Sequence, residues 1–125
     1  MKPPKYKLRD SFRFAFEGIR STFQTERNFR IHLVVAIVVI GMALFLEVPK
    51  IDFILLLIII ALVFCAELLN TAIEAVIDLV SPEWHPFAKV AKDTAAGAVL
   101  VSAVFAVVIG VLIFYKPFMS WIGLN

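Results

Sequence analysis

The sequence predicts an all-α integral membrane protein with three transmembrane helices per protomer and an N-terminal amphipathic surface helix. Two observations support this prediction. Hydrophobic residues make up 62% of the 125 residues, whereas soluble domains contain about 45–50%. The apolar residues also gather in three long runs. Because a soluble fold of this length could not bury so much apolar surface, we expect the excess to face lipid within a single domain, residues 1–125.

The three apolar runs define the predicted spans, at about 31–48, 51–80 and 94–115. A membrane-spanning helix needs about 20 residues, so the first run is marginal, the second is long and the third fits. A helix satisfies its own backbone hydrogen bonds in lipid, and we therefore predict that all three runs are helical. The second connection is expected to run from Ser81 to Asp93, with prolines ending the preceding helix.

The segment before the first span, at about 8–25, has apolar and charged residues on opposite faces at helical spacing. A basic helix with an aromatic face is typical of helices that lie in the membrane interface, although the same face could pack against the bundle. Among the twelve Lys and Arg residues, only Lys50 and Lys116 fall outside the N-terminal segment and the second connection. The positive-inside pattern therefore predicts a cytoplasmic N-terminus and an external C-terminus.

The second span carries polar side chains in steps of three and four residues: Glu67, Asn70, Thr71, Glu74 and Asp78. This spacing places them on one helix face. Carboxylates inside a span are costly and by default mark a functional site. The fourteen apolar residues before Glu67 rise about 21 Å through a core of roughly 30 Å, so we expect Glu67 in its cytoplasmic third and Glu74 about 10 Å nearer the headgroups.

Two other features of the sequence leave their interpretation open. The carboxylates of the second span could instead pair with nearby Arg and Lys residues and stabilise the bundle. The third span carries small residues every four positions, which favours close helix packing within or between subunits. These residues are Thr94, Ala98, Ser102, Ala106 and Gly110.

No glycine-rich phosphate-binding motif is present among the five glycines. Any nucleotide must therefore be held by metal-bridged carboxylates, basic side chains and aromatic contacts. The second connection supplies such groups, namely Glu83, Trp84, His85, Lys92 and Asp93. Taken singly, Trp84 could be an interface anchor and Asp93 a helix N-cap.

The segments ERNFRIH (26–32), AELLNTAIEAVIDL (66–79) and AKDTAAGAVLV (91–101) resemble the prokaryotic diacylglycerol kinase and undecaprenol kinase family, and SFRFAFEGIR (11–20) is a weaker match. The resemblance implies a bacterial cell-membrane lipid kinase, a homotrimer with sites shared between subunits. It also implies Mg²⁺ as cofactor and ATP as phosphoryl donor. We expect no nucleic-acid partner.

The resemblance further implies a role for each matching residue. Glu67 is the expected catalytic base at the lipid hydroxyl, and Glu26 and Glu74 are the expected Mg²⁺ ligands. Asn70 is expected near the transferred phosphoryl group. Lys92 and Asp93 are expected at the triphosphate and, with Glu67 and Asn70, make up the expected catalytic residues. The other expected nucleotide contacts are Lys7, Phe14, Glu83, Trp84 and His85. The expected lipid contacts are Arg20, Phe23, Asn28 and Phe29.

The ERNFRIH and SFRFAFEGIR variants are similar to the Gram-positive branch of the family, which implies phosphorylation of undecaprenol to undecaprenyl phosphate. Two alternatives stay open at this point. One is a diacylglycerol kinase that makes phosphatidic acid. The other is a membrane protein without enzymatic activity, whose carboxylates relay protons or ions.

Overall fold

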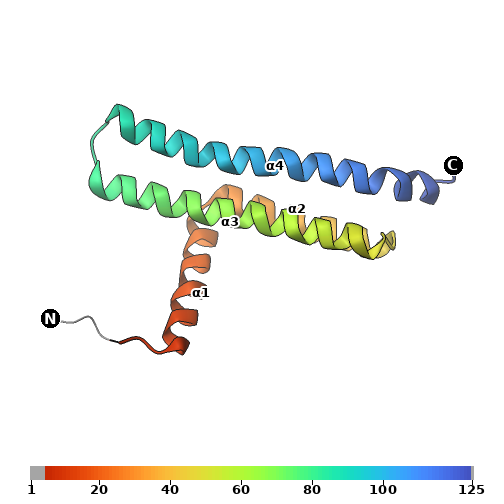
Figure 1. Cartoon of the computed structure of the whole chain (residues 1–125), viewed down its shortest axis with the longest axis horizontal. Coiled ribbons are helices and arrows are strands. Elements are labelled where there is room, and N and C mark those ends of the chain that lie inside the picture. The colour runs from red at the N-terminus through yellow and green to blue at the C-terminus, as the bar shows by residue number, and fades with distance from the viewer. Residues whose placement is uncertain (1–4, 125) are drawn as a thin grey trace.

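A computed structural model describes residues 5–124, and this part of the chain is entirely helical apart from short connections. The helices are α1 (Leu8–Thr25), α2 (Arg27–Phe45), α3 (Lys50–Val80) and α4 (Pro86–Trp121). Helices α2, α3 and α4 lie lengthwise beside one another, with α3 running opposite to α2 and α4, and α1 leaves the bundle at a steep angle (Figure 1). Lys2, one of the basic residues used in the topology prediction, lies outside the described residues.

Helices α2, α3 and α4 are each long and apolar enough to cross a membrane, which confirms the predicted number of spans. Most of their large apolar side chains are exposed on the outer faces of the chain. In water this exposure would be costly, but in a bilayer these side chains face lipid tails. Helix α1 covers the predicted range of 8–25, and only Thr22 within it is buried.

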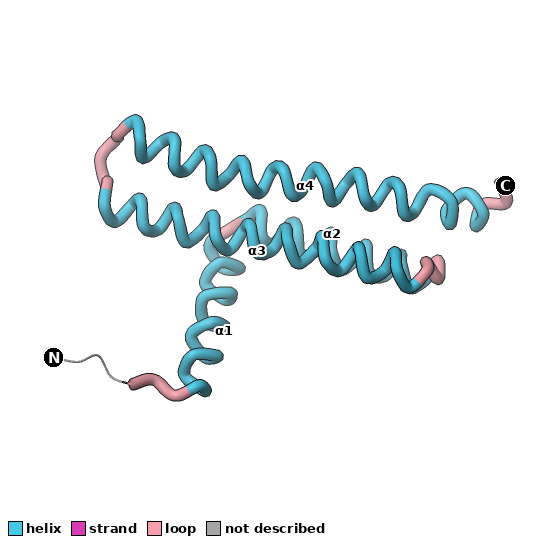
Figure 2. Tube along the Cα trace, in the orientation of Figure 1, coloured by secondary structure: helices cyan, strands magenta, loops and turns pink. Residues whose placement is uncertain are grey.

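Helix α4 begins at Pro86 and not at Thr94, so the predicted extent of the second connection is wrong. The connecting loop is confined to the few residues between α3 and α4 (Figure 2). Proline is favoured at the first position of a helix because its missing N–H needs no partner there. His85 caps this end, since its Nδ1 accepts a hydrogen bond from the backbone N–H of Phe87 at 3.2 Å. Asp93 therefore lies inside the helix and is not the N-cap.

Helix α2 also starts before the predicted span, at Arg27, and ends at Phe45 instead of residue 48. It ends because the following turn passes through Glu47, which adopts a left-handed conformation with φ 51°. The backbone N–H of Val48 then donates to the carbonyl of Ala43 at 3.1 Å. This closure satisfies one of the last carbonyl groups of the helix.

The corner between α1 and α2 is held by Arg30. Its Nη1 donates hydrogen bonds to the carbonyl oxygens of Phe23 and Gln24, both at 2.9 Å. These carbonyls end α1 and have no partner within the helix. Glu26, the single residue between the two helices, is thereby held at the end of the bundle where α1 begins to diverge.

Helix α3 is the central element and packs against both α2 and α4. At one end of the bundle Ala43, Leu56 and Ile113 form a small buried cluster, with one residue from each helix. At the other end Phe29 of α2 packs on Phe64 of α3, with ring centroids 5.1 Å apart. These contacts hold α2 against α3 at the level of the polar residues.

The small residues of α4 do not all face the same neighbour. Ser102 is buried and Ala106 lines a groove between the helices, whereas Thr94 and Ala98 are exposed. Four residues rotate a helix by slightly more than one turn, so a stripe at this spacing winds around the helix. The C-terminal part of the stripe therefore serves packing within the chain, and the N-terminal part is exposed in this chain.

Candidate active site

The site forms around the polar face of α3. Glu67 is its most buried member, with only 3% of its side chain exposed. The hydroxyl of Thr71 donates to the backbone carbonyl of Glu67 at 3.0 Å. One turn further along, the side-chain amide of Asn70 donates to Oε1 of Glu74 at 3.1 Å. Glu67, Asn70 and Glu74 were predicted to share one face of α3, and two of them, Asn70 and Glu74, are in direct contact.

Helix α2 supplies a partner for the buried carboxylate. Nε2 of His32 lies 3.2 Å from Oε1 of Glu67. The ring N–H is at ion-pair distance but is not aligned for a hydrogen bond, and Oε1 has no other donor in the described part of the chain. Two further carboxylates, those of Glu26 and Glu74, are close enough to act on Glu67 electrostatically.

A pocket of about 380 Å³ opens beside this cluster. Its polar lining comes from Asn28 and His32 on α2 and from Glu67 and Asn70 on α3, while α4 contributes apolar side chains. Within residues 5–124, both Oε1 of Glu67 and Oδ1 of Asn70 are buried without a hydrogen-bond donor. Buried acceptors are normally satisfied, and these two oxygens have no donor within the described residues.

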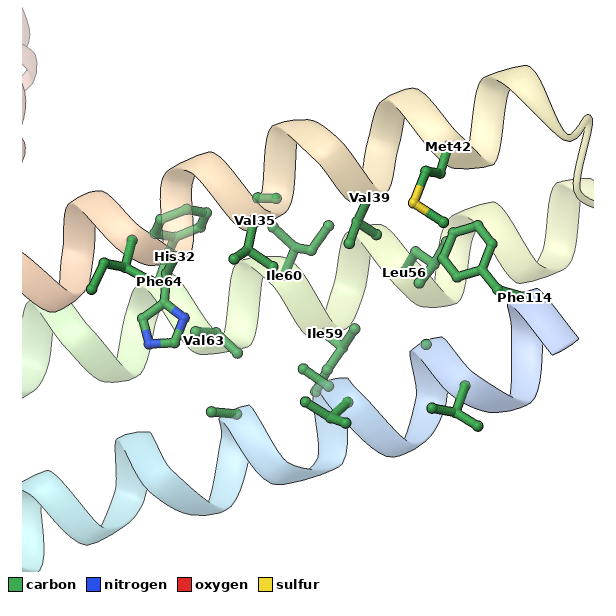
Figure 3. A pocket seen from close by; sticks show the side chains of 17 residues that line it. His32, Val35, Val39, Met42, Leu56, Ile59, Ile60, Val63, Phe64 and Phe114 are labelled. Carbon is green, nitrogen blue, oxygen red and sulfur yellow. The ribbon is translucent and has the colours of Figure 1, made fainter. Parts of the chain in front are cut away.

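An apolar groove of about 370 Å³ continues from the pocket along the bundle. Figure 3 shows its labelled side chains in a row, from Met42, Leu56 and Phe114 at one end to His32 at the other. Ile31, His32 and Ala103 line both the groove and the polar pocket. The apolar groove therefore leads to a polar pocket that contains the buried carboxylate of Glu67.

Mg²⁺ is the metal that the sequence predicts, with Glu26 and Glu74 as ligands. Among residues 5–124 there is no group of three or more His, Cys, Asp or Glu side chains arranged to hold a metal by themselves. Mg²⁺ is commonly bound by one or two carboxylates together with substrate phosphates. Two glutamates near the end of the bundle therefore fit an ion that arrives with a nucleotide.

Lys92 and Asp93 follow α3 in sequence but contact different partners. Lys92 forms an ion pair with Asp78 of α3, and Asp93 forms one with Lys89, four residues earlier on α4. Both pairs are largely exposed. The ammonium group of Lys92 is thus held by Asp78, one turn beyond Glu74 on α3, and 39% of the Lys92 side chain is exposed.

The loop between α3 and α4 presents Glu83, Trp84 and His85 to solvent or to the membrane surface. All three are exposed, and 79% of Trp84 is accessible. The hydroxyl of Ser81 donates to the carbonyl of Glu83 at 3.1 Å, which tightens the turn. The imidazole of His85 is occupied as the cap of α4.

The predicted residues of α1 do not join the pocket within one chain. Lys7 lies at the start of α1, which points away from the bundle (Figure 1). Phe14 is exposed and contacts Tyr6 edge to face, with centroids 5.2 Å apart. Arg20 and Phe23 are exposed as well. Of the predicted lipid contacts, Asn28 lines the pocket, whereas Phe29 is buried against α3.

His32 received no functional role from the sequence, although it belongs to the ERNFRIH segment. Its position near the start of an apolar run was the available signal, because a titratable side chain in a span points to a functional site. Pairing with Glu67 depends on how α2 packs on α3, and the sequence does not show that packing directly.

A sequence profile described as prokaryotic diacylglycerol kinase matches residues 13–114. The chain belongs to this family. The matched range contains Glu67, His32 and the ion pairs of α4, and Lys7 is the one predicted site residue that lies outside it. The relatives named below are lipid kinases, and the family is thus one of enzymes.

The relatives that align with the chain include diacylglycerol kinases and an undecaprenol kinase. It is 45% identical to the diacylglycerol kinase of Synechocystis over 88% of this chain and 63% of that protein. It is 46% identical to the undecaprenol kinase of Bacillus subtilis over 83% of this chain and 85% of that protein. The diacylglycerol kinase of Escherichia coli is 32% identical, over 84% and 86% respectively. The chain thus spans less than two thirds of the Synechocystis relative.

Proposed function

We propose that this protein is a membrane lipid kinase that transfers the γ-phosphoryl group of ATP to the hydroxyl of undecaprenol. The observation that carries this proposal is the pair of buried acceptors, Oε1 of Glu67 and Oδ1 of Asn70, at the end of an apolar groove. A lipid alcohol has the two complementary parts. Its chain is apolar, and its hydroxyl is the donor that these acceptors lack.

The proposed reaction follows from the chemistry of these groups. Glu67 accepts the proton of the lipid hydroxyl while the lipid oxygen forms a bond to the γ-phosphorus. The bond from that phosphorus to the bridging oxygen breaks, and ADP leaves. A base at a deep site needs to be within hydrogen-bond reach of the hydroxyl, and contributes about 10²–10⁴-fold in rate. Asn70 connects this base to the phosphate side, since it contacts Glu74.

The nucleotide is expected at the shallower end of α3. Glu26 and Glu74 would hold Mg²⁺, which supplies neutralisation of the triphosphate charge when bound. Lys92 would contact the phosphates as a point charge. Phosphoryl transfer depends mainly on positioning and charge stabilisation. Asp78 positions the ammonium group of Lys92, which would supply positive charge to the phosphates. The exposed loop with Trp84 is placed to contact the base or ribose.

Two features support a homotrimer with shared sites. Lys7 and Phe14, expected at the nucleotide, lie at the end of α1 that points away from the pocket of their own chain. In a homotrimer, Lys7 and Phe14 of a neighbouring subunit would instead contact the nucleotide bound at the pocket of this chain. The exposed Thr94 and Ala98 of α4 offer a surface where helices can approach closely.

The proposed orientation has the pocket near the cytoplasmic face of a bacterial membrane. It follows from the Lys and Arg residues of the N-terminal segment and of the connection between the second and third spans.

Diacylglycerol is the second candidate substrate, because a relative of that name aligns as well as the undecaprenol kinase does. The choice of undecaprenol is supported by the ERNFRIH and SFRFAFEGIR segments. Purified protein in mixed micelles, supplied with Mg²⁺, labelled ATP and both lipids together, tests the proposal. We expect labelled undecaprenyl phosphate to predominate. Predominant phosphatidic acid would assign the other substrate, and no lipid-dependent label would refute the kinase.

A further inference from the structure

His32 occupies the junction of the two compartments of the site. It lines both the apolar groove and the polar pocket, and 26% of its side chain is exposed. In Figure 3 its imidazole stands at the end of the row of labelled apolar side chains. His32 therefore lies at the boundary between the apolar groove and the polar pocket that contains Glu67.

The carboxylate of Glu67 has few other groups that could hold it. Among the described residues, His32 is the basic side chain within ion-pair distance of Glu67. The other charged groups that act on Glu67 are Glu26 and Glu74, and both repel it. Thr71 donates to the backbone carbonyl of Glu67 and leaves the carboxylate untouched. A carboxylate buried to this extent is expensive without a partner.

We infer that His32 is a positioning residue for Glu67, and this inference rests on the proposed function. The imidazole lies with Nε2 3.2 Å from Oε1 of Glu67 without an aligned hydrogen bond. It therefore limits from α2 the orientations open to the carboxylate and leaves Oε1 free to meet the lipid hydroxyl. His32 acts through Glu67 and does not contact the nucleotide. Its loss should therefore reduce the turnover number and leave the KM for ATP nearly unchanged.

Two matched variants test the contact. In His32→Gln the amide nitrogen reaches about as far as Nε2, whereas in His32→Asn the same amide is shorter by one methylene. Misplacement of a catalytic group by about 1 Å costs on the order of 10²-fold. We expect His32→Asn to lose about tenfold to a hundredfold in kcat, and His32→Gln to keep most of it. Equal activity of the two variants would overturn the inference. Val38→Leu, on the exposed face of α2, controls for general effects on that helix.

A double-variant cycle tests whether His32 acts through Glu67. Contacting residues that work as a unit give strongly non-additive effects. In a Glu67→Gln background, His32→Asn should cause no further loss of lipid phosphorylation, and multiplied losses would contradict the inference. If the unaltered protein phosphorylates no lipid, the proposed function fails. If it is active, Glu67→Gln is inactive and His32→Asn is fully active, only the role of His32 fails.

Discussion

Asn70 and Glu74 are linked by a hydrogen bond of 3.1 Å between the side-chain amide of one and Oε1 of the other. Asn70 lies one turn from the buried Glu67 on α3, and the bond connects it to Glu74 one turn further along. It also fixes the amide so that its nitrogen faces Glu74, while its oxygen is left buried without a donor.

The first prediction concerns the two proposed metal ligands. Glu26→Gln and Glu74→Gln should each raise the KM for magnesium ATP, because Mg²⁺ prefers charged oxygen ligands. Steady-state kinetics at varied Mg²⁺ measures the effect. Glu17→Gln, on an exposed face of α1, is the matched control and should leave the KM unchanged. Unaltered nucleotide affinity in either test variant would remove that residue from the metal site.

The second prediction separates Lys92 from its partner. Lys92→Gln should raise the KM for ATP at least about tenfold, since a hydrogen bond to a charged group contributes roughly 1.5–3 kcal/mol. Asp78→Asn should change it less than about fivefold, because an exposed ion pair contributes roughly 0.2–1 kcal/mol. Isothermal titration with a non-hydrolysable nucleotide compares the two variants. A larger effect from Asp78→Asn would mean that Lys92 serves mainly to join α3 to α4.

The third prediction uses the division of the small-residue stripe on α4. Ala98→Leu adds bulk at an exposed position and should weaken the oligomer in crosslinking experiments. Ala106→Leu places the same bulk in the apolar groove. It should lower activity toward long-chain lipid without changing the crosslinking pattern. The reverse result would mean that the groove is filled by a neighbouring subunit.

The fourth prediction concerns orientation in the membrane. Cys65 is the single cysteine of the chain, so a Cys65→Ser background allows one labelled position at a time. In right-side-out vesicles, Lys50→Cys should react with a membrane-impermeant maleimide, and Phe87→Cys should react only after permeabilisation. Both positions are exposed. The opposite pattern would invert the proposed topology and place the ATP site outside.

The sequence predicted the helices and the polar face of α3 because both follow from periodicity within a single element. Glu67, Asn70 and Glu74 had to share a face wherever α3 was placed. The start of α4 was missed because the segment with Lys89, Lys92 and Asp93 is polar, and a hydropathy run locates the membrane-embedded part of a helix and not its end. The proline and the capping His85 were the local signals of that end.

The contact between His32 and Glu67 could not be predicted from the pattern of either helix alone. It arises from the packing of α2 on α3, to which the aromatic contact of Phe29 with Phe64 contributes. No spacing within either helix encodes it. The ion pair of Lys92 with Asp78 agrees with the alternative in which a carboxylate of the second span pairs with a nearby lysine. The ion pair of Asp93 with Lys89 was not predicted, because it depends on the earlier start of α4.

The central claim is that Glu67 is the base that accepts the proton of the lipid hydroxyl. Its most direct test compares Glu67→Gln with the unaltered protein in two measurements on the same preparation, lipid phosphorylation and nucleotide binding. The change removes the charge and keeps the shape of the side chain. We predict a loss of about 10²–10⁴-fold in turnover, with nucleotide affinity within about twofold of the unaltered protein because a base acts on the hydroxyl and not on ATP. Near-normal turnover in this variant would contradict the account.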